Sequence, residues 1–193
     1  MEKQRTLKQY RTIDLSLFAI MLVVFEYVIT HAAKFWFPAQ PYTVSLAAVI
    51  TAIVYMRWGA WGGIHAVLAG IVFCVFSGAS GQQYVIYSIG NLLSLAAVLI
   101  LRFAGKEKVR TGWLSLIFPL IVLLLMQIGR AVTAIALGAS PLSVTGFFTT
   151  DSLSYLFTFV IIWIARRLDG IYEDQKHYLL RIHAKQESRE GGL

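Results

Sequence analysis

The run WLSLIFPLIVLLLMQIGRAVTAIAL, residues 113–137, contains one charged side chain, Arg130. An α-helix needs about 20 apolar residues to cross the hydrocarbon layer of a bilayer, so this run is predicted to form a transmembrane helix. An ionised side chain inside such a helix costs about 2.5–3.5 kcal/mol even on lenient insertion scales. Arg130 is therefore expected to face a protein interior or water, with a partner, rather than lipid.

The rest of the chain has the same apolar character. Of its 193 residues 58% are hydrophobic and 14% are charged, which leaves too little polar surface for a soluble domain of this size. The fold class expected is an all-α membrane protein, a six-transmembrane-helix bundle formed by one domain over residues 1–167. Turn-forming stretches separate the predicted spans, which are residues 15–33, 42–56, 62–78, 84–101, 113–137 and 152–165.

The placement of basic residues predicts the orientation. Of the 17 Lys and Arg residues, Lys34 alone falls in a predicted outer loop and Arg130 alone within a span. The positive-inside rule then puts both termini in the cytoplasm, with residues 1–14 as a retained tail and residues 168–193 as an amphipathic tail helix. The net charge of +7 is thus a topology signal and an attraction to the lipid bilayer, and no nucleic-acid partner is expected.

Hydrogen-bonding side chains recur at similar depth in the outer halves of four predicted spans. Gln127, Arg130 and Thr133 follow at three-residue steps and project from one stripe of the fifth span. The guanidinium fork suits an anionic or carbonyl group of a ligand. The predicted substrate-binding residues are Arg130, Glu26, Gln127, Asn91, Tyr87, Tyr84, Asp151, Tyr155 and Trp36.

Each of these assignments has a structural alternative. Glu26 is the expected counter-charge of Arg130, with Asp151 as the second candidate, and such a pair would also serve merely to lock two helices together. The outer aromatic residues are equally typical of membrane-interface anchors, and His65 is expected to be packed. The sequence has no metal-ligand spacing and no nucleotide-binding or catalytic motif, so neither a cofactor nor enzymatic activity is expected.

Small residues along the third span indicate a close approach of helices. Gly62, Ala66 and Gly70 form a ladder at helical spacing. This ladder fits close packing within one bundle, or a groove that admits helices of another subunit.

With its six predicted spans and the glycine-rich stretch RWGAWGGIHAVLAGIVFCVFSG, residues 57–78, the chain resembles the substrate-binding S-components of energy-coupling factor (ECF) transporters. The resemblance covers nearly the whole chain in topology and polar placement. It implies a vitamin-sized ligand held in the outer half of the bundle, a transmembrane coupling subunit and two cytoplasmic ATPase subunits, in a bacterial plasma membrane. The aromatic outer region favours a ring-rich ligand such as cobalamin.

One motif departs from the family pattern. Many members dock on the coupling subunit through an AxxxA pattern in the first span, whereas AIMLV at residues 19–23 keeps a single alanine. Partner docking is therefore expected at Ala19 and along the ladder of Gly62, Ala66 and Gly70.

Three other functions fit the same residues. The first is a solitary transporter in which Glu26 is the proton-linked carboxylate. The second is an intramembrane enzyme that uses Glu26, Asp151 or His65. The third is a scaffold without a ligand.

Overall fold

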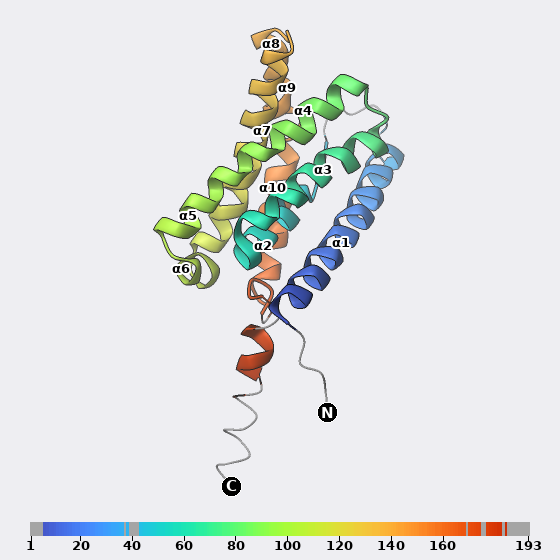
Figure 1. The fold of residues 1–193 in the computed structure, drawn as a ribbon. Helices are drawn as coiled ribbons and strands as arrows, with labels where there is room; N and C mark the ends of the chain where they lie inside the picture. The colour runs from blue at the N-terminus through green and yellow to red at the C-terminus, as the bar shows by residue number, and fades with distance from the viewer. Residues whose placement is uncertain are drawn as a thin grey trace.

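The computed structural model describes residues 6–36, 38, 43–168, 170–174, 177–182 and 184. Over these residues every regular element is a helix (Figure 1). The α-helices are α1 (Leu7–Trp36), α2 (Ala47–Trp58), α3 (Gly62–Ser77), α4 (Gly81–Asn91), α5 (Ala97–Phe103), α6 (Lys106–Thr111), α7 (Leu114–Ala136), α8 (Pro141–Val144), α9 (Gly146–Thr149) and α10 (Ser152–Ala165). Two short 3₁₀ helices join them, η1 (Gly59–Trp61) and η2 (Leu92–Ala96).

The all-helical architecture is confirmed, and it fits a bundle that crosses a membrane several times. The six-span count and the side on which the termini lie stay predictions. Residues 7–14, expected in a tail, instead form the start of α1. Five helical stretches of the described chain are long and apolar enough to span a bilayer, namely Leu7–Trp36, Ala47–Ser77, Gly81–Phe103, Leu114–Ala136 and Pro141–Ala165.

Helix α2 lies at the centre of the bundle. Every residue from Ala47 to Arg57 is buried, and the helix packs against α1, α3, α7 and α10. A helix that is apolar all round is stable in this position because no side of it meets water. Its 12 residues rise about 18 Å at 1.5 Å per residue, less than the roughly 30 Å of a hydrocarbon layer.

The chain reverses direction at Gly59, which ends α2. Its backbone has φ 61° and ψ −133°, a conformation that glycine adopts without a steric penalty. Leu46, just before α2, donates a backbone hydrogen bond to Glu26, while Arg57 near the end of α2 pairs with Asp14. Helix α2 therefore runs antiparallel to α1.

Helix α3 runs parallel to α1. Near its start the His65 ring nitrogen Nε2 lies 3.0 Å from the Leu15 carbonyl oxygen. At its far end Lys34 donates to the Phe76 carbonyl at 2.7 Å. The apolar stretch Ala47–Ser77 is thus folded into two antiparallel helices.

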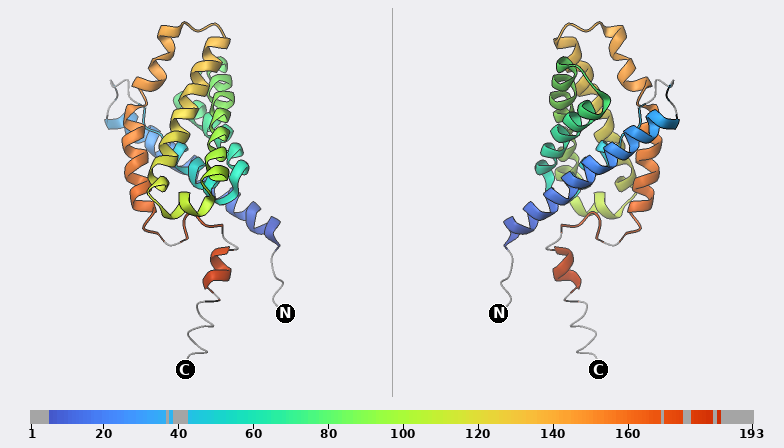
Figure 2. Two further views of the ribbon diagram at one scale, coloured as in Figure 1. Left: turned by 90° about the vertical axis from the view of Figure 1, so that its left-hand side faces the viewer. Right: turned by 90° about the vertical axis from the view of Figure 1, so that its right-hand side faces the viewer.

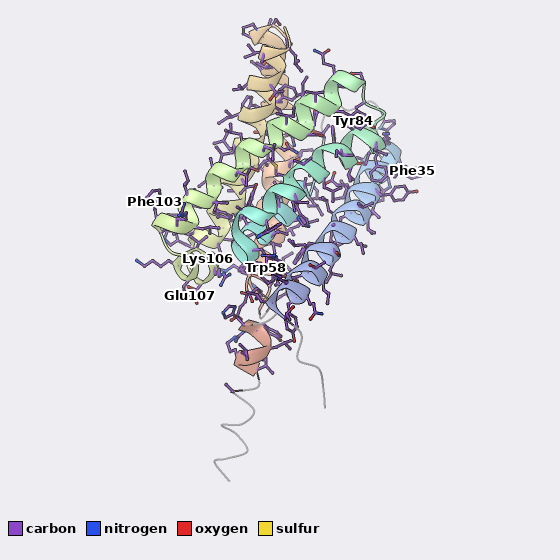
Figure 3. All side chains as sticks on the ribbon, viewed as in Figure 1. Phe35, Trp58, Tyr84, Phe103, Lys106 and Glu107 are labelled. Carbon is purple, nitrogen blue, oxygen red and sulfur yellow. The ribbon has the colours of Figure 1, made fainter. Side chains whose placement is uncertain are left out.

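The two ends of the bundle differ in composition. Helix α1 begins and α10 ends at one end, whereas α8 and α9 stand at the other (Figure 2). Phe103, Lys106 and Glu107 lie toward the first of these ends, while Phe35 and Tyr84 lie toward the second (Figure 3). The first end carries the basic residues on which the inside prediction depends, as far as the structure describes them.

The segment after α10 docks at this basic end. Arg57 donates to the Gly170 and Ile171 carbonyls at 3.1 and 2.9 Å. In the predicted tail helix residues 177–182 are helical. Residues 168 and 170–174 of the predicted tail helix are not helical. Residues 169, 175, 176, 183 and 185–193 lie outside the described residues, as do residues 1–5.

Candidate functional site

A contact between two glycines brings α4 and α7 together. A Cβ at Gly90 would lie 2.6 Å from the Arg130 Cα, and a Cβ at Gly129 would run into the Gly90 carbonyl oxygen. Because neither glycine has a side chain, the two backbones touch. Asn91 and Arg130, the residues that follow these glycines, are consequently placed side by side.

Arg130 is buried and held by three neighbours. Its Nε donates to Asn91 Oδ1 at 2.8 Å, and its Nη1 donates to Asp151 Oδ2 at 2.9 Å. Its Cζ lies 4.6 Å from the centroid of the Tyr87 ring, in cation–π geometry. Asn91 is fixed in turn, because its Nδ2 donates to the Ala66 carbonyl at 2.9 Å. The guanidinium is therefore held in one orientation by the protein itself.

The expected pairing of Arg130 with Glu26 is wrong, since Asp151 is the counter-charge. Glu26 instead caps the central helix. Its Oε1 accepts from the Ser45 hydroxyl at 2.8 Å and from the backbone N–H groups of Leu46 and Ala47 at 2.7 and 3.0 Å. The N-terminus of a helix carries a partial positive charge and unpaired N–H groups, so it satisfies one oxygen of this buried carboxylate.

A chain of hydrogen bonds nevertheless links Asp151 to Glu26. The Thr43 hydroxyl donates to Asp151 Oδ1. The Ser154 hydroxyl donates to the Thr43 carbonyl and accepts from the Ser45 N–H, each at 3.2 Å. Ser45 then donates to Glu26 through its own hydroxyl. Arg130 and Glu26 thus belong to one polar network, although they do not touch.

This network satisfies a stretch of non-helical backbone, residues 43–46. The segment precedes the short helix α2 and lies among α1, α10 and α2. Non-helical backbone at membrane depth is tolerated only where protein or water satisfies its polar groups. The Thr43 N–H donates to the Thr150 carbonyl at 3.0 Å. The Ser45 N–H donates to the Ser154 hydroxyl, and the next two N–H groups donate to Glu26. The roles of Thr43, Ser45 and Ser154 were not predicted; the brevity of the second predicted span was the available signal.

Gln127 and Tyr155 form a second polar contact between α7 and α10. The Tyr155 hydroxyl donates to Gln127 Oε1 at 2.5 Å. The Gln127 Nε2 is buried and has no hydrogen-bond partner among the described residues. Buried polar atoms without a partner are rare in folded proteins. The other buried side-chain atoms without a hydrogen-bond partner among the described residues are Glu26 Oε2, Thr51 Oγ1, Thr158 Oγ1 and His65 Nδ1.

Aromatic rings line one flank of Arg130. Tyr87 stacks on Phe73, with centroids 4.7 Å apart, and meets Phe147 edge-on at 5.9 Å. Tyr84 is half-buried one turn away on the same helix and takes no part in the described hydrogen-bond network. Trp36 is 69% exposed at the end of α1. Seven of the nine predicted substrate-binding residues therefore belong to the network around Arg130 or to the contact of Gln127 with Tyr155. Tyr84 and Trp36 belong to neither.

The ladder of small residues packs inside the bundle rather than on its surface. A Cβ at Gly62 would lie 2.5 Å from the Tyr55 ring, and one at Gly70 would lie 2.6 Å from the Tyr87 backbone. Ala66 is fully buried. Docking of a partner on this ladder is thus corrected to close packing against α2 and α4. Ala19 is half-buried on α1.

The charged groups do not form a metal centre, because no three His, Cys, Asp or Glu residues within the described part of the chain could hold a metal ion. The geometry offers a fixed guanidinium, a buried amide and stacked rings, all of which can contact a ligand. Comparison of the chain with protein-family models, with characterised proteins and with solved structures gives no match.

Proposed function

We propose that the chain is the substrate-capture subunit of an ECF-type importer. In this proposal it crosses a bacterial plasma membrane six times with both ends in the cytoplasm. The antiparallel course of α2 and α3 supports six passes, because it turns one of the five apolar stretches into two. A small vitamin-like molecule enters from outside, binds beside Arg130 and is passed on with a coupling subunit and two ATPase subunits.

The observation that carries the proposal is the unused part of the Arg130 fork. Asn91 and Asp151 fix Nε and Nη1, while Nη2 makes no hydrogen bond to any described residue. Nη2 is not among the fully buried atoms without a partner, so an acceptor on a ligand could reach it and complete its coordination. The Nε2 of Gln127 is a second donor without a partner among the described residues, and it is fully buried.

The charge balance indicates the class of ligand. Because Asp151 neutralises Arg130, the site as a whole carries little net charge, so a carbonyl or amide acceptor fits better than a free anion. Tyr87, with Phe73 and Phe147 around it, offers ring faces for stacking. The ligand is accordingly a ring-bearing molecule with hydrogen-bond acceptors, and cobalamin is the first compound to test.

The proposal is tested by native mass spectrometry of the purified full-length protein. The wild type is expected to release a bound small molecule on collisional activation, and Arg130→Gln to release none. Arg102→Gln, which removes an exposed arginine at the opposite end, serves as the matched control and should keep the molecule. Retention by Arg130→Gln at the wild-type level would reject the assignment of this site.

A specific observation also favours a scaffold without a ligand. Both oxygens of Asp151 are engaged, and the network satisfies the backbone of residues 43–46. In that case Arg130→Gln lowers the unfolding midpoint, while neither the wild type nor the variant carries a small molecule. Native mass spectrometry and the unfolding midpoint together therefore distinguish a substrate-capture subunit from a scaffold.

A further inference from the structure

A cavity lies at the basic end of the bundle, far from Arg130. It is formed by α6, the end of α10 and the segment that follows α10, and its volume is about 540 Å³, within the range of small-molecule sites. Six charged side chains line it, namely Glu107, Arg110, Arg166, Arg167, Glu173 and Arg181.

Some of these charges are already engaged. Glu173 pairs with Arg181 at 3.0 Å. Arg110 donates from Nε and Nη2 to the Met56 carbonyl at 3.1 and 2.6 Å, which caps the C-terminal end of α2. These three side chains give the wall of the cavity a defined shape.

Two arginines remain with open donors. The side chains of Arg166 and Arg167 make no hydrogen bond or ion pair to any described residue. The Arg167 guanidinium stacks over the Trp163 ring, with Cζ 4.4 Å from its centroid. Four arginines and two glutamates line the described part of the cavity wall, so this wall carries a net positive charge.

Large aromatic residues place this cavity at the depth of a membrane interface. Trp113, Phe103 and Trp163 are all exposed around the same end of the bundle, and aromatic side chains gather where lipid headgroups meet the hydrocarbon layer. Phe103 and Glu107 lie together at this end (Figure 3).

We propose that this cavity binds a phosphate group. Arginine forks match the geometry of phosphate oxygens and form bidentate charge-assisted hydrogen bonds with them. The phosphate is carried either by an anionic phospholipid of the adjacent leaflet or by a soluble phosphorylated molecule. A phosphate held by Arg166 and Arg167 would bind where α10 ends, on the side of the cavity that faces α6. This site does not depend on the function of Arg130.

The test uses the full-length protein in detergent. In one arm phosphatidylglycerol or phosphatidylcholine is titrated and bound lipid is counted by native mass spectrometry. In the other arm inorganic phosphate is added and the thermal unfolding midpoint is followed. The variant is Arg166→Gln with Arg167→Gln. Its matched control is Arg102→Gln with Lys108→Gln, which removes two exposed charges from the same end without touching the cavity.

The site variant is expected to lose phosphate or phosphatidylglycerol affinity by at least about tenfold, since each charge-assisted bond contributes about that factor. The control should change affinity less than about twofold. Preference for phosphatidylglycerol without a response to inorganic phosphate assigns the site to lipid, and the converse assigns it to a soluble ligand. Binding in neither arm, or an equal loss in site variant and control, overturns the proposal.

Discussion

Replacing Gly90 by alanine tests whether the contact of α4 with α7 builds the Arg130 site. The new Cβ would lie 2.6 Å from the Arg130 Cα and N, about 0.8 Å short of the 3.4 Å at which ordinary contact begins. Backbone atoms cannot swing aside as a flexible side chain can, so the helices must separate. A comparable shift would stretch the 2.8 Å bond between Arg130 and Asn91 to about 3.6 Å, beyond hydrogen-bond range.

The expected cost has three parts. Overpacking costs about 1–3 kcal/mol, and the lost bond to a charged donor costs about 1.5–3 kcal/mol. Alanine's better helix propensity returns about 1 kcal/mol. The free energy of unfolding should therefore fall by about 1.5–5 kcal/mol, and ligand affinity should fall with it.

The assay is reversible unfolding in mixed detergent micelles, followed by circular dichroism. Gly81→Ala in the same helix is the control, because no atom lies within 4 Å of a Cβ built there, and its stability should stay within about 0.5 kcal/mol of the wild type. A Gly90→Ala protein as stable as Gly81→Ala would refute the reasoning that direct backbone contact positions Arg130.

Three other variants test the rest of the fold. Asp14→Asn should cost about 3 kcal/mol in the free energy of unfolding, because it leaves the buried Arg57 without its charged partner; hydrogen exchange should then rise in the docked segment after α10. Glu26→Ala should cost about 2–4 kcal/mol by stripping the cap from α2, and Glu26→Gln, which keeps an acceptor, should cost less than half of that. Burial raises the pKa of Tyr172 to about 12 from its usual 10, so the folded state favours the neutral phenol and stability should fall as the pH rises from 10 to 12. Tyr172→Phe should lose this part of the alkaline fall, and equal falls in both proteins would contradict it.

The sequence predicts the helices well where hydrophobic run length and turn chemistry decide them. The last predicted span, residues 152–165, coincides with α10, and the third differs from α3 by one residue. The start of α1 was missed because charged residues such as Lys8 and Arg11 are typical of a tail. A helix that extends out of a bilayer keeps such residues in its exposed turns.

Which side chains pair with one another in the site was harder to predict than the depth at which they lie along their helices. The positions of Arg130, Asn91 and Asp151 along their spans placed them at one level, and the structure brings these three together. The partner of Glu26 depended on where α2 begins, and a helix start capped from another helix leaves no local signal. The ladder at Gly62 likewise shows that a helix approaches closely without showing which one.

The most direct test of the central claim is the dissociation constant of the released molecule for wild type and Arg130→Gln, measured by equilibrium binding to the purified proteins. Loss of the charge-assisted bond from the Arg130 fork predicts binding weaker by about 10- to 150-fold, in a protein that remains monodisperse. An unchanged dissociation constant would contradict the claim that this buried guanidinium holds a ligand.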